Sequence, residues 1–238
     1  DLLNNPHTNP LREVWSVAWP TVLTMTSFTF MQFVDQLMVS QVGPTEVAAQ
    51  GSGAIWAFVP LAFAMGMLSI VNTWVSQNVG AGKNSETSIY GWTAIWLSLA
   101  IWLLILIPWA FMLPWFFAFV HPDASAELLA LETQYGQILM VGGFFTLGAR
   151  GIHQFFFGTL RPIVVTMSAV CGNVVNIVVS YVLVFGDQGI EHLGLPGIPG
   201  IAPMSVAGAA WGTVAGVFVE LLVPMIVFLS PATHARYD

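Results

Sequence analysis

Charged residues are scarce in this chain, and their scarcity excludes an ordinary soluble protein. Only 7% of the 238 residues are Asp, Glu, Lys or Arg, whereas a typical soluble domain carries about 25%. Hydrophobic residues make up 56%, which leaves too little polar surface for solubility. The apolar segments are long and continuous, unlike the alternating strands of a membrane barrel. We therefore expect an all-α integral membrane protein, with membrane lipid around it.

Basic residues and cysteine are rarer still. The chain has five Lys and Arg residues, which form no patch, and a net charge of −7, so nucleic acid is not an expected partner. The single cysteine, Cys171, cannot form an internal disulfide, and its apolar neighbours favour a packing role. The first ten residues, DLLNNPHTNP, are polar and rich in proline, so no removable signal peptide is predicted.

Long apolar stretches are what the chain does have. A membrane-spanning helix needs about 20 predominantly apolar residues, and six stretches are long enough. They cover about residues 14–39, 47–75, 89–117, 129–149, 163–185 and 206–229. The segment between the last two is rich in Gly and Pro and reads as a loop. The sequence therefore predicts one six-helix transmembrane unit over residues 1–238.

The basic residues predict the orientation of these spans. With six spans, all five lie on one side of the membrane: Arg12, Lys83, Arg150, Arg161 and Arg236. The opposite loops carry acidic residues without Lys or Arg. By the positive-inside rule, both termini are cytoplasmic. Residues 151–160 are too short to cross and are expected to continue the fourth helix at the inner interface.

Two carboxylates fall inside predicted spans, where an ionisable group is costly and suggests a function. Asp35 lies in the outer half of the first span, and Glu220 lies midway along the sixth. Asp35 either ends its helix near the outer interface or forms a protonatable or cation-binding site. Glu220 either is held neutral by a neighbouring helix or lines a cavity. Arg150 and His153 are expected near the inner end of the fourth span, where an arginine can reach the surface.

The fifth and first spans supply further polar and bending elements. Asn173, Asn176 and Ser180 share one helical face because they are spaced by three and four residues. Such a stripe either holds two helices together or lines an internal cavity. Pro20 precedes Asp35 on the first helix, and a proline removes a backbone donor and bends a helix.

Four segments carry a resemblance to a known family. They are WPTVLTMTSFTFMQFVDQLMVSQVG in the first span, NTWVSQNVGAGKNSE after the second, ARGIHQFFFGTLRPIVVTMSAVCGNVVNIVVSYVLVFGDQG across the fourth-to-fifth connection, and SVAGAAWGTVAGVFVE in the sixth. In this order and spacing, the chain resembles the multidrug and toxic compound extrusion (MATE) transporters over nearly its whole length. The resemblance implies a cation-coupled antiporter in the plasma (inner) membrane that exports organic cations or amphipathic toxic compounds.

The resemblance also implies residue roles. Asp35 would be the coupling carboxylate, Asn176 its partner and Pro20 the helix bend, while Asn173 corresponds less directly. Some members have an Asp four residues after the second Asn, where this chain has Ser180. This departure favours proton coupling over a sodium site at Asp35 and Asn176. No cofactor other than the coupling ion is expected.

The family has two six-helix lobes, and this chain resembles one of them. The expected partner is therefore a second lobe, which is a missing C-terminal half, a second copy or another chain. The main alternative is a lipid or glycolipid flippase of related architecture, whose cavity would carry basic groups. No Lys or Arg is expected within a span core, so a neutral or cationic substrate is favoured. An enzyme is not expected, because GSGAIW at residues 51–56 lacks the G-x-S-x-G pattern and the loop histidines have no metal-ligand spacing.

Overall fold

Helices form nearly all of the described structure. The computed structural model describes residues 10–190 and 194–237. The elements are α1 (Pro10–Ser40), α2 (Pro44–Leu68), α3 (Ile70–Gly80), η2 (Asn84–Glu86), α4 (Ser88–Ile101), η3 (Trp102–Leu106), α5 (Ile107–Val120), α6 (Ala126–Val141), α7 (Gly143–Gly158), α8 (Pro162–Phe185), α9 (Ser205–Phe228) and α10 (Pro231–Tyr237). Within these ranges, extended backbone pairs at a single isolated bridge, Ile190 with Leu195. The prediction of an all-α fold is confirmed.

Three of the long helical segments are interrupted without losing their direction. Ser69 separates α2 from α3, and Gly142 separates α6 from α7. A π-helical turn, η3, joins α4 to α5 just before Pro108, which lacks the N–H that a continuous helix would use. The indole of Trp102 in this turn donates to the carbonyls of Met140 and Val141 at 3.1 and 3.0 Å. It therefore satisfies carbonyl groups that the break at Gly142 exposes.

Six long helical segments result in the described part of the chain, and they overlap the six predicted spans. Four of them are long and apolar enough to cross a membrane: Pro44–Gly80, Asn84–Val120, Pro162–Phe185 and Ser205–Phe228. The α6–α7 segment does not meet the same hydropathy criterion and carries Glu127, Glu132 and Arg150. The α1 segment, which carries Asp35, also falls outside it.

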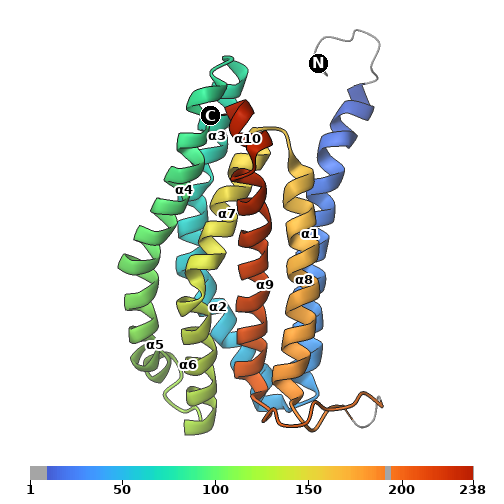
Figure 1. Ribbon diagram of the computed structural model, residues 1–238. Helices are drawn as coiled ribbons and strands as arrows, with labels where there is room; N and C mark the ends of the chain where they lie inside the picture. Colours follow the sequence, from blue (N-terminus) through green and yellow to red (C-terminus); the bar gives the residue numbers. More distant parts are fainter. Residues whose placement is uncertain (1–9, 191–193, 238) are drawn as a thin grey trace.

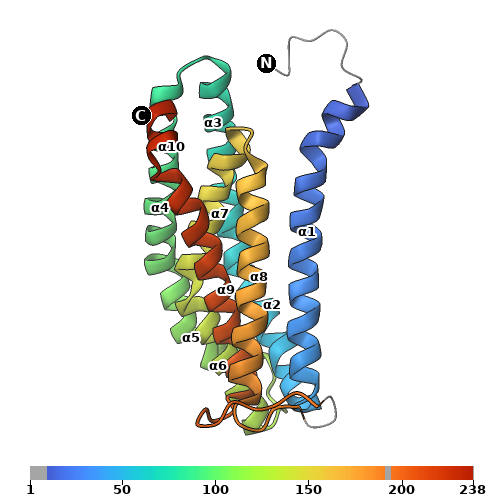
Figure 2. The same ribbon diagram turned by 45° about the vertical axis from the view of Figure 1, so that its right-hand side comes forward.

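The segments stand side by side, with their connections at two opposite ends (Figures 1 and 2). The α3–α4 connection, the α7–α8 turn and α10 lie at the end where α1 begins. Lys83, Arg161 and Arg236 belong to these elements, whereas Arg12 lies outside the described side chains. The other end has the α1–α2 turn, the α5–α6 turn and the α8–α9 loop. The charge pattern therefore agrees with a cytoplasmic position for the first end.

Small residues bring α8 and α9 into close contact. Gly208, Gly212 and Gly216 recur every four residues on α9 and face α8. A Cβ at Gly216 would lie 2.8 Å from the Cβ of Asn176, and one at Gly212 would lie 2.8 Å from the backbone N and Cα of Ser180. Small residues at this spacing let two membrane helices approach at backbone distance. The α8–α9 pair therefore forms a closely packed unit at the centre of the lobe.

Helix α1 lies at the edge of the bundle and packs mainly on α8 (Figure 2). The two helices are joined by polar contacts along their length. The hydroxyls of Thr24 and Thr166 are 3.1 Å apart, and Asn173 Nδ2 donates to the backbone oxygen of Ser27 at 2.9 Å and to its hydroxyl. The last contact of this series is at Asp35, which accepts a hydrogen bond from Asn176 on α8.

Candidate functional site

Asp35 is the centre of a buried polar site between α1, α8 and α9. The residue is 5% exposed. Its Oδ1 accepts a hydrogen bond from Ser180 Oγ at 3.1 Å, and its Oδ2 accepts from Asn176 Nδ2 at 3.1 Å and from Thr213 Oγ1 at 3.3 Å. Asp35 lies inside α1 with its carboxylate turned toward α8 and α9. This geometry does not fit the alternative in which Asp35 only ends α1 near the outer interface.

Asn176 and Ser180 reach Asp35 because they are one turn apart on α8. Both side chains are fully buried, and the glycines of α9 leave room for them. The amide oxygen of Asn176 is buried and has no hydrogen-bond partner among the described residues. The site therefore contains an unused acceptor next to the carboxylate, and a buried unused acceptor is costly.

Three polar residues near this site were not predicted from the sequence. Thr213 on α9 donates either to Asp35 or to the carbonyl of Ala209 at 3.1 Å. Tyr135 on α6 is buried beside Gln50 of α2, within electrostatic reach of Asp35. Their spans carry other polar residues as well. No spacing rule linked these three to Asp35, which lies on another helix.

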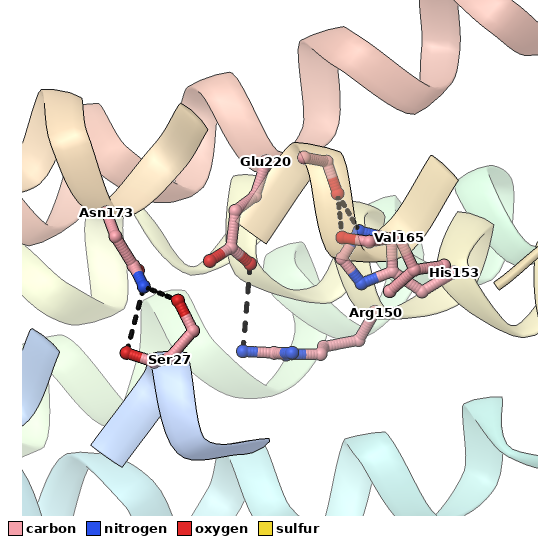
Figure 3. Close-up of polar contacts among 7 residues, drawn as sticks. Ser27, Arg150, His153, Val165, Asn173 and Glu220 are labelled. Atoms are coloured by element: carbon pink, nitrogen blue, oxygen red, sulfur yellow. Dashed lines mark hydrogen bonds and ion pairs between the residues drawn. The ribbon is translucent and has the colours of Figure 1, made fainter. Parts of the chain in front are cut away.

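The second asparagine of the stripe binds a different part of α1. Asn173 contacts Ser27 through its Nδ2 (Figure 3), and its buried Oδ1 has no hydrogen-bond partner in the described part of the chain. Asn173 and Asn176 thus lie on the same side of α8 but do not share a partner. The sequence grouped them as one stripe, and the structure divides them between two contacts with α1.

Glu220 belongs to a separate polar cluster. The helix that carries Arg150 continues past it to Gly158, as expected for residues 151–160. Arg150 lies in this inner part of the α6–α7 segment and faces α9. Its Nη2 is 3.8 Å from Oε2 of Glu220 on α9 (Figure 3). Glu220 therefore has a basic neighbour.

His153 lies one turn after Arg150 and is buried. Its Nε2 is 3.0 Å from Ser168 Oγ, while the hydroxyl of Ser168 donates to the carbonyl of Val165 at 2.8 Å. Because that hydroxyl has one hydrogen, His153 is the donor in the pair. This arrangement is that of a packed histidine that links α7 to α8.

The predicted bend at Pro20 cannot be followed at the side chain, which lies outside the described residues. The backbone of α1 is helical through this position. The role of Pro20 stays a prediction.

A comparison with family models decides what this arrangement belongs to. The MatE model matches residues 20–182, which include Asp35, Asn173, Asn176 and Ser180. The chain belongs to the MatE family. The predicted relationship to the MATE transporters is confirmed, and with it membership of a family of integral membrane transporters.

Relatives and solved structures of MATE proteins agree with this assignment. The probable multidrug resistance protein NorM of Neisseria meningitidis is 26% identical over 202 residues, which are 82% of this chain and 42% of that protein. The multidrug resistance protein PmpM of Pseudomonas aeruginosa is 28% identical over 195 residues, covering 79% of this chain and 39% of the relative.

Among solved structures, a MATE protein in the bent conformation superposes with a TM-score of 0.79 at 20% identity, covering 97% of this chain and 48% of that one. The eukaryotic MATE transporter AtDTX14 gives a TM-score of 0.77 at 17% identity, covering 95% and 47%. The chain spans less than half the length of these proteins. Its helices thus correspond to one lobe of the MATE fold.

Proposed function

We propose that this MatE lobe couples cation entry to the export of organic cations or amphipathic toxic compounds, with Asp35 as the coupling carboxylate. The observation that carries the proposal is the burial of Asp35 without a counter-charge. Among the described side chains, no Lys, Arg or His forms an ion pair with it. A buried carboxylate without a basic partner favours uptake of a proton or a metal cation.

A proton fits the donor set better than sodium does. Asn176, Ser180 and Thr213 each present a donor to the carboxylate. A sodium ion would need their oxygen atoms instead, and Ser180 stands where a second carboxylate would strengthen such a site. A proton on Asp35 converts one carboxylate oxygen into a donor, and the amide of Asn176 can rotate to present its unpartnered Oδ1.

This change would alter how α1 is held. Asp35 belongs to α1, while its three partners belong to α8 and α9. Protonation removes the charge that strengthens those hydrogen bonds, so α1 binds the α8–α9 pair less tightly after cation uptake. The coupling step is thus a change in the contact between one helix and a packed pair of helices.

The chain covers 42% of the NorM relative and 39% of PmpM, which supports a second lobe in the working transporter. A second six-helix lobe would complete the substrate cavity, whether it is a C-terminal half, a second copy or another chain. The plasma (inner) membrane is the proposed location. A lipid or glycolipid flippase stays the second candidate, because Arg150 is a basic group inside the lobe. It is the less favoured one, because Glu220 offsets that charge.

The test is Asp35→Asn in the transport-competent assembly that contains this lobe. Efflux of a cationic dye, driven by a pH gradient across everted vesicles, is expected to be lost at unchanged protein level. Asp123→Asn, in the loop between α5 and α6, is the matched control and keeps efflux. Equal efflux by the Asp35 variant and the control would remove Asp35 from the coupling mechanism.

A further inference from the structure

Two prolines lie inside helices of the lobe and leave backbone carbonyls without their usual donors. Pro60 is inside α2 and Pro114 is inside α5. Because proline has no N–H, it cannot donate to the carbonyl four residues earlier. The carbonyls concerned are those of Trp56 and Ala110. An unsatisfied carbonyl is costly inside a membrane, so each needs a donor from elsewhere.

Side chains of neighbouring helices supply these donors. The indole Nε1 of Trp109 on α5 donates to the carbonyl of Trp56 at 3.2 Å. The amide Nε2 of Gln137 on α6 donates to the carbonyl of Ala110 at 3.0 Å. The indole of Trp102 in η3 donates in the same way to the last carbonyls of α6. These bonds link α2 to α5, α5 to α6, and α6 to η3 in one series.

The helical parts beyond these interruptions pack closely. We call residues 44–59 of α2, together with α5 and α6, the outer unit. The helices α5 and α6 lie side by side at the end of the lobe away from the start of α1 (Figure 1). A Cβ at Gly53 would lie 3.0 Å from Cδ1 of Tyr135, and one at Gly136 would lie 2.8 Å from Cδ1 of Leu113. The outer unit therefore has little room for its helices to move separately.

The outer unit is also closed at its tip and joined to α1. At the tip, Nδ1 of His121 is 3.1 Å from Oε2 of the buried Glu132. The connection to α1 is short, because α1 ends at Ser40 and α2 begins at Pro44. A change in the position of α1 is therefore transmitted directly to α2.

We propose that the outer unit moves as one rigid body with α1, relative to the α8–α9 pair, and turns where Pro60, η3 and Gly142 interrupt its helices. At these points fewer backbone hydrogen bonds resist bending. The donors from Trp109 and Gln137 keep the three helices aligned while the unit turns, and Trp102 holds the unit to η3. The inference rests on the proposed function for its trigger, the release of α1, and adds which part of the lobe follows.

Double electron–electron resonance between spin labels in the assembled transporter measures this movement. The labels are placed in a Cys171→Ser chain, at exposed positions. The pairs are Phe119 with Val178, between the outer unit and α8; Ile55 with Phe119, within the outer unit; and Ile89 with Met167, at the inner end. On transfer from mildly alkaline to mildly acidic buffer, the first distance is expected to change by several ångströms and the other two to stay constant. A constant first distance, or an equal change in either other pair, would overturn the proposal.

A double-mutant cycle tests the hydrogen bonds that align the outer unit. Pro60→Ala gives α2 a backbone N–H for the carbonyl of Trp56, so the indole of Trp109 is no longer needed. Trp109→Phe is expected to lower the unfolding midpoint in detergent by about 2–4 °C in the native chain, and by clearly less in the Pro60→Ala chain. The volume lost from tryptophan is the same in both backgrounds and cancels. Equal losses would show that the indole only fills space.

A second cycle and a control keep this test independent of any one variant. Gln137→Leu is compared in the native chain and in Pro114→Ala, which restores a donor to the carbonyl of Ala110. Trp115→Phe is the control, because this α5 side chain is 73% exposed, and it should have the same small effect in every background. Absence of coupling in both cycles would overturn the alignment of the outer unit. Neither cycle uses an ion gradient, so both are independent of the efflux test on Asp35.

Discussion

Asn173 and Asn176 are one turn apart on α8, yet each holds α1 at a different place. Asn176 donates to the Asp35 carboxylate, and Asn173 donates to Ser27. Both leave a buried amide oxygen without a partner among the described residues. The asparagine beside Asp35 can exchange donor for acceptor when the carboxylate gains a proton. Asn173 donates to the backbone oxygen of Ser27. This oxygen does not gain or lose a proton.

Replacing each asparagine separately tests this division. Asn176→Ala removes a donor from Asp35 and is expected to reduce gradient-driven dye efflux by about tenfold, as loss of a hydrogen bond to a charged group would. Asn173→Ala is expected to lower stability by about 1 kcal/mol, with a smaller loss of efflux. Vesicle efflux and thermal unfolding in detergent measure the two effects. A larger efflux defect in the Asn173 variant would show that coupling runs through Ser27 instead.

At the scale of elements, the α8–α9 pair determines the geometry of the site. Its two helices meet through glycines, so the side chains of Asn176, Ser180 and Thr213 project from backbones that are close together. By contrast, α1 meets this pair through polar side chains. Hydrogen bonds between membrane helices are individually modest. The contact between α1 and α8 is therefore the one that changes most readily.

A methyl group at Gly212, where α9 contacts α8, should push these two helices apart. Gly212→Ala places a Cβ against the backbone of Ser180 and is expected to destabilise the lobe by about 1–3 kcal/mol. Gly66→Ala is the matched control, because a Cβ at this α2 position meets no atom within 4 Å and alanine favours a helix over glycine. Unfolding midpoints in detergent compare them. Equal midpoints would show that the two backbones separate at little cost.

At the scale of the whole molecule, this chain matches one lobe of proteins more than twice as long. It covers 42% of the NorM relative and 48% of the solved bent-conformation structure. Among the described residues, the hydrogen-bond partners of Asp35 all come from α8 and α9. A substrate pathway across the membrane needs a second lobe to enclose it, and inverted or parallel repeats form such lobes in many transporters.

Transport by the chain alone tests this requirement. Proteoliposomes that contain the purified 238-residue chain as a monomer are expected to show no gradient-driven dye uptake, although the chain binds the dye. Addition of the second lobe should restore uptake. Light scattering in detergent establishes the oligomeric state of each sample. Uptake by verified monomers would mean that one lobe is a sufficient transporter.

The sequence predicted those parts of the site that repeat at helical spacing. Asp35 stood out because a carboxylate is rare in an apolar run, and Asn176 and Ser180 stood out as a one-turn pair. Thr213 and Tyr135 could not be found in this way, because no periodicity along their own helices relates them to Asp35 on α1. Arg150 was expected near the inner end of its span, and the helix continues past it to Gly158 as expected. Its ion pair with Glu220 could not be predicted, because no spacing rule relates residues on two different helices.

The contact of Gly208, Gly212 and Gly216 with α8 also limits how the Asp35 site can respond to its coupling ion. Because α8 and α9 meet at backbone distance, the helices that carry Asn176, Ser180 and Thr213 keep a fixed spacing. Asp35 then either binds these three side chains or separates from them, with few intermediate positions. The lobe should therefore respond to its coupling ion by switching between two positions of α1. The energy difference between them would lie almost wholly in the contact of α1 with the α8–α9 pair.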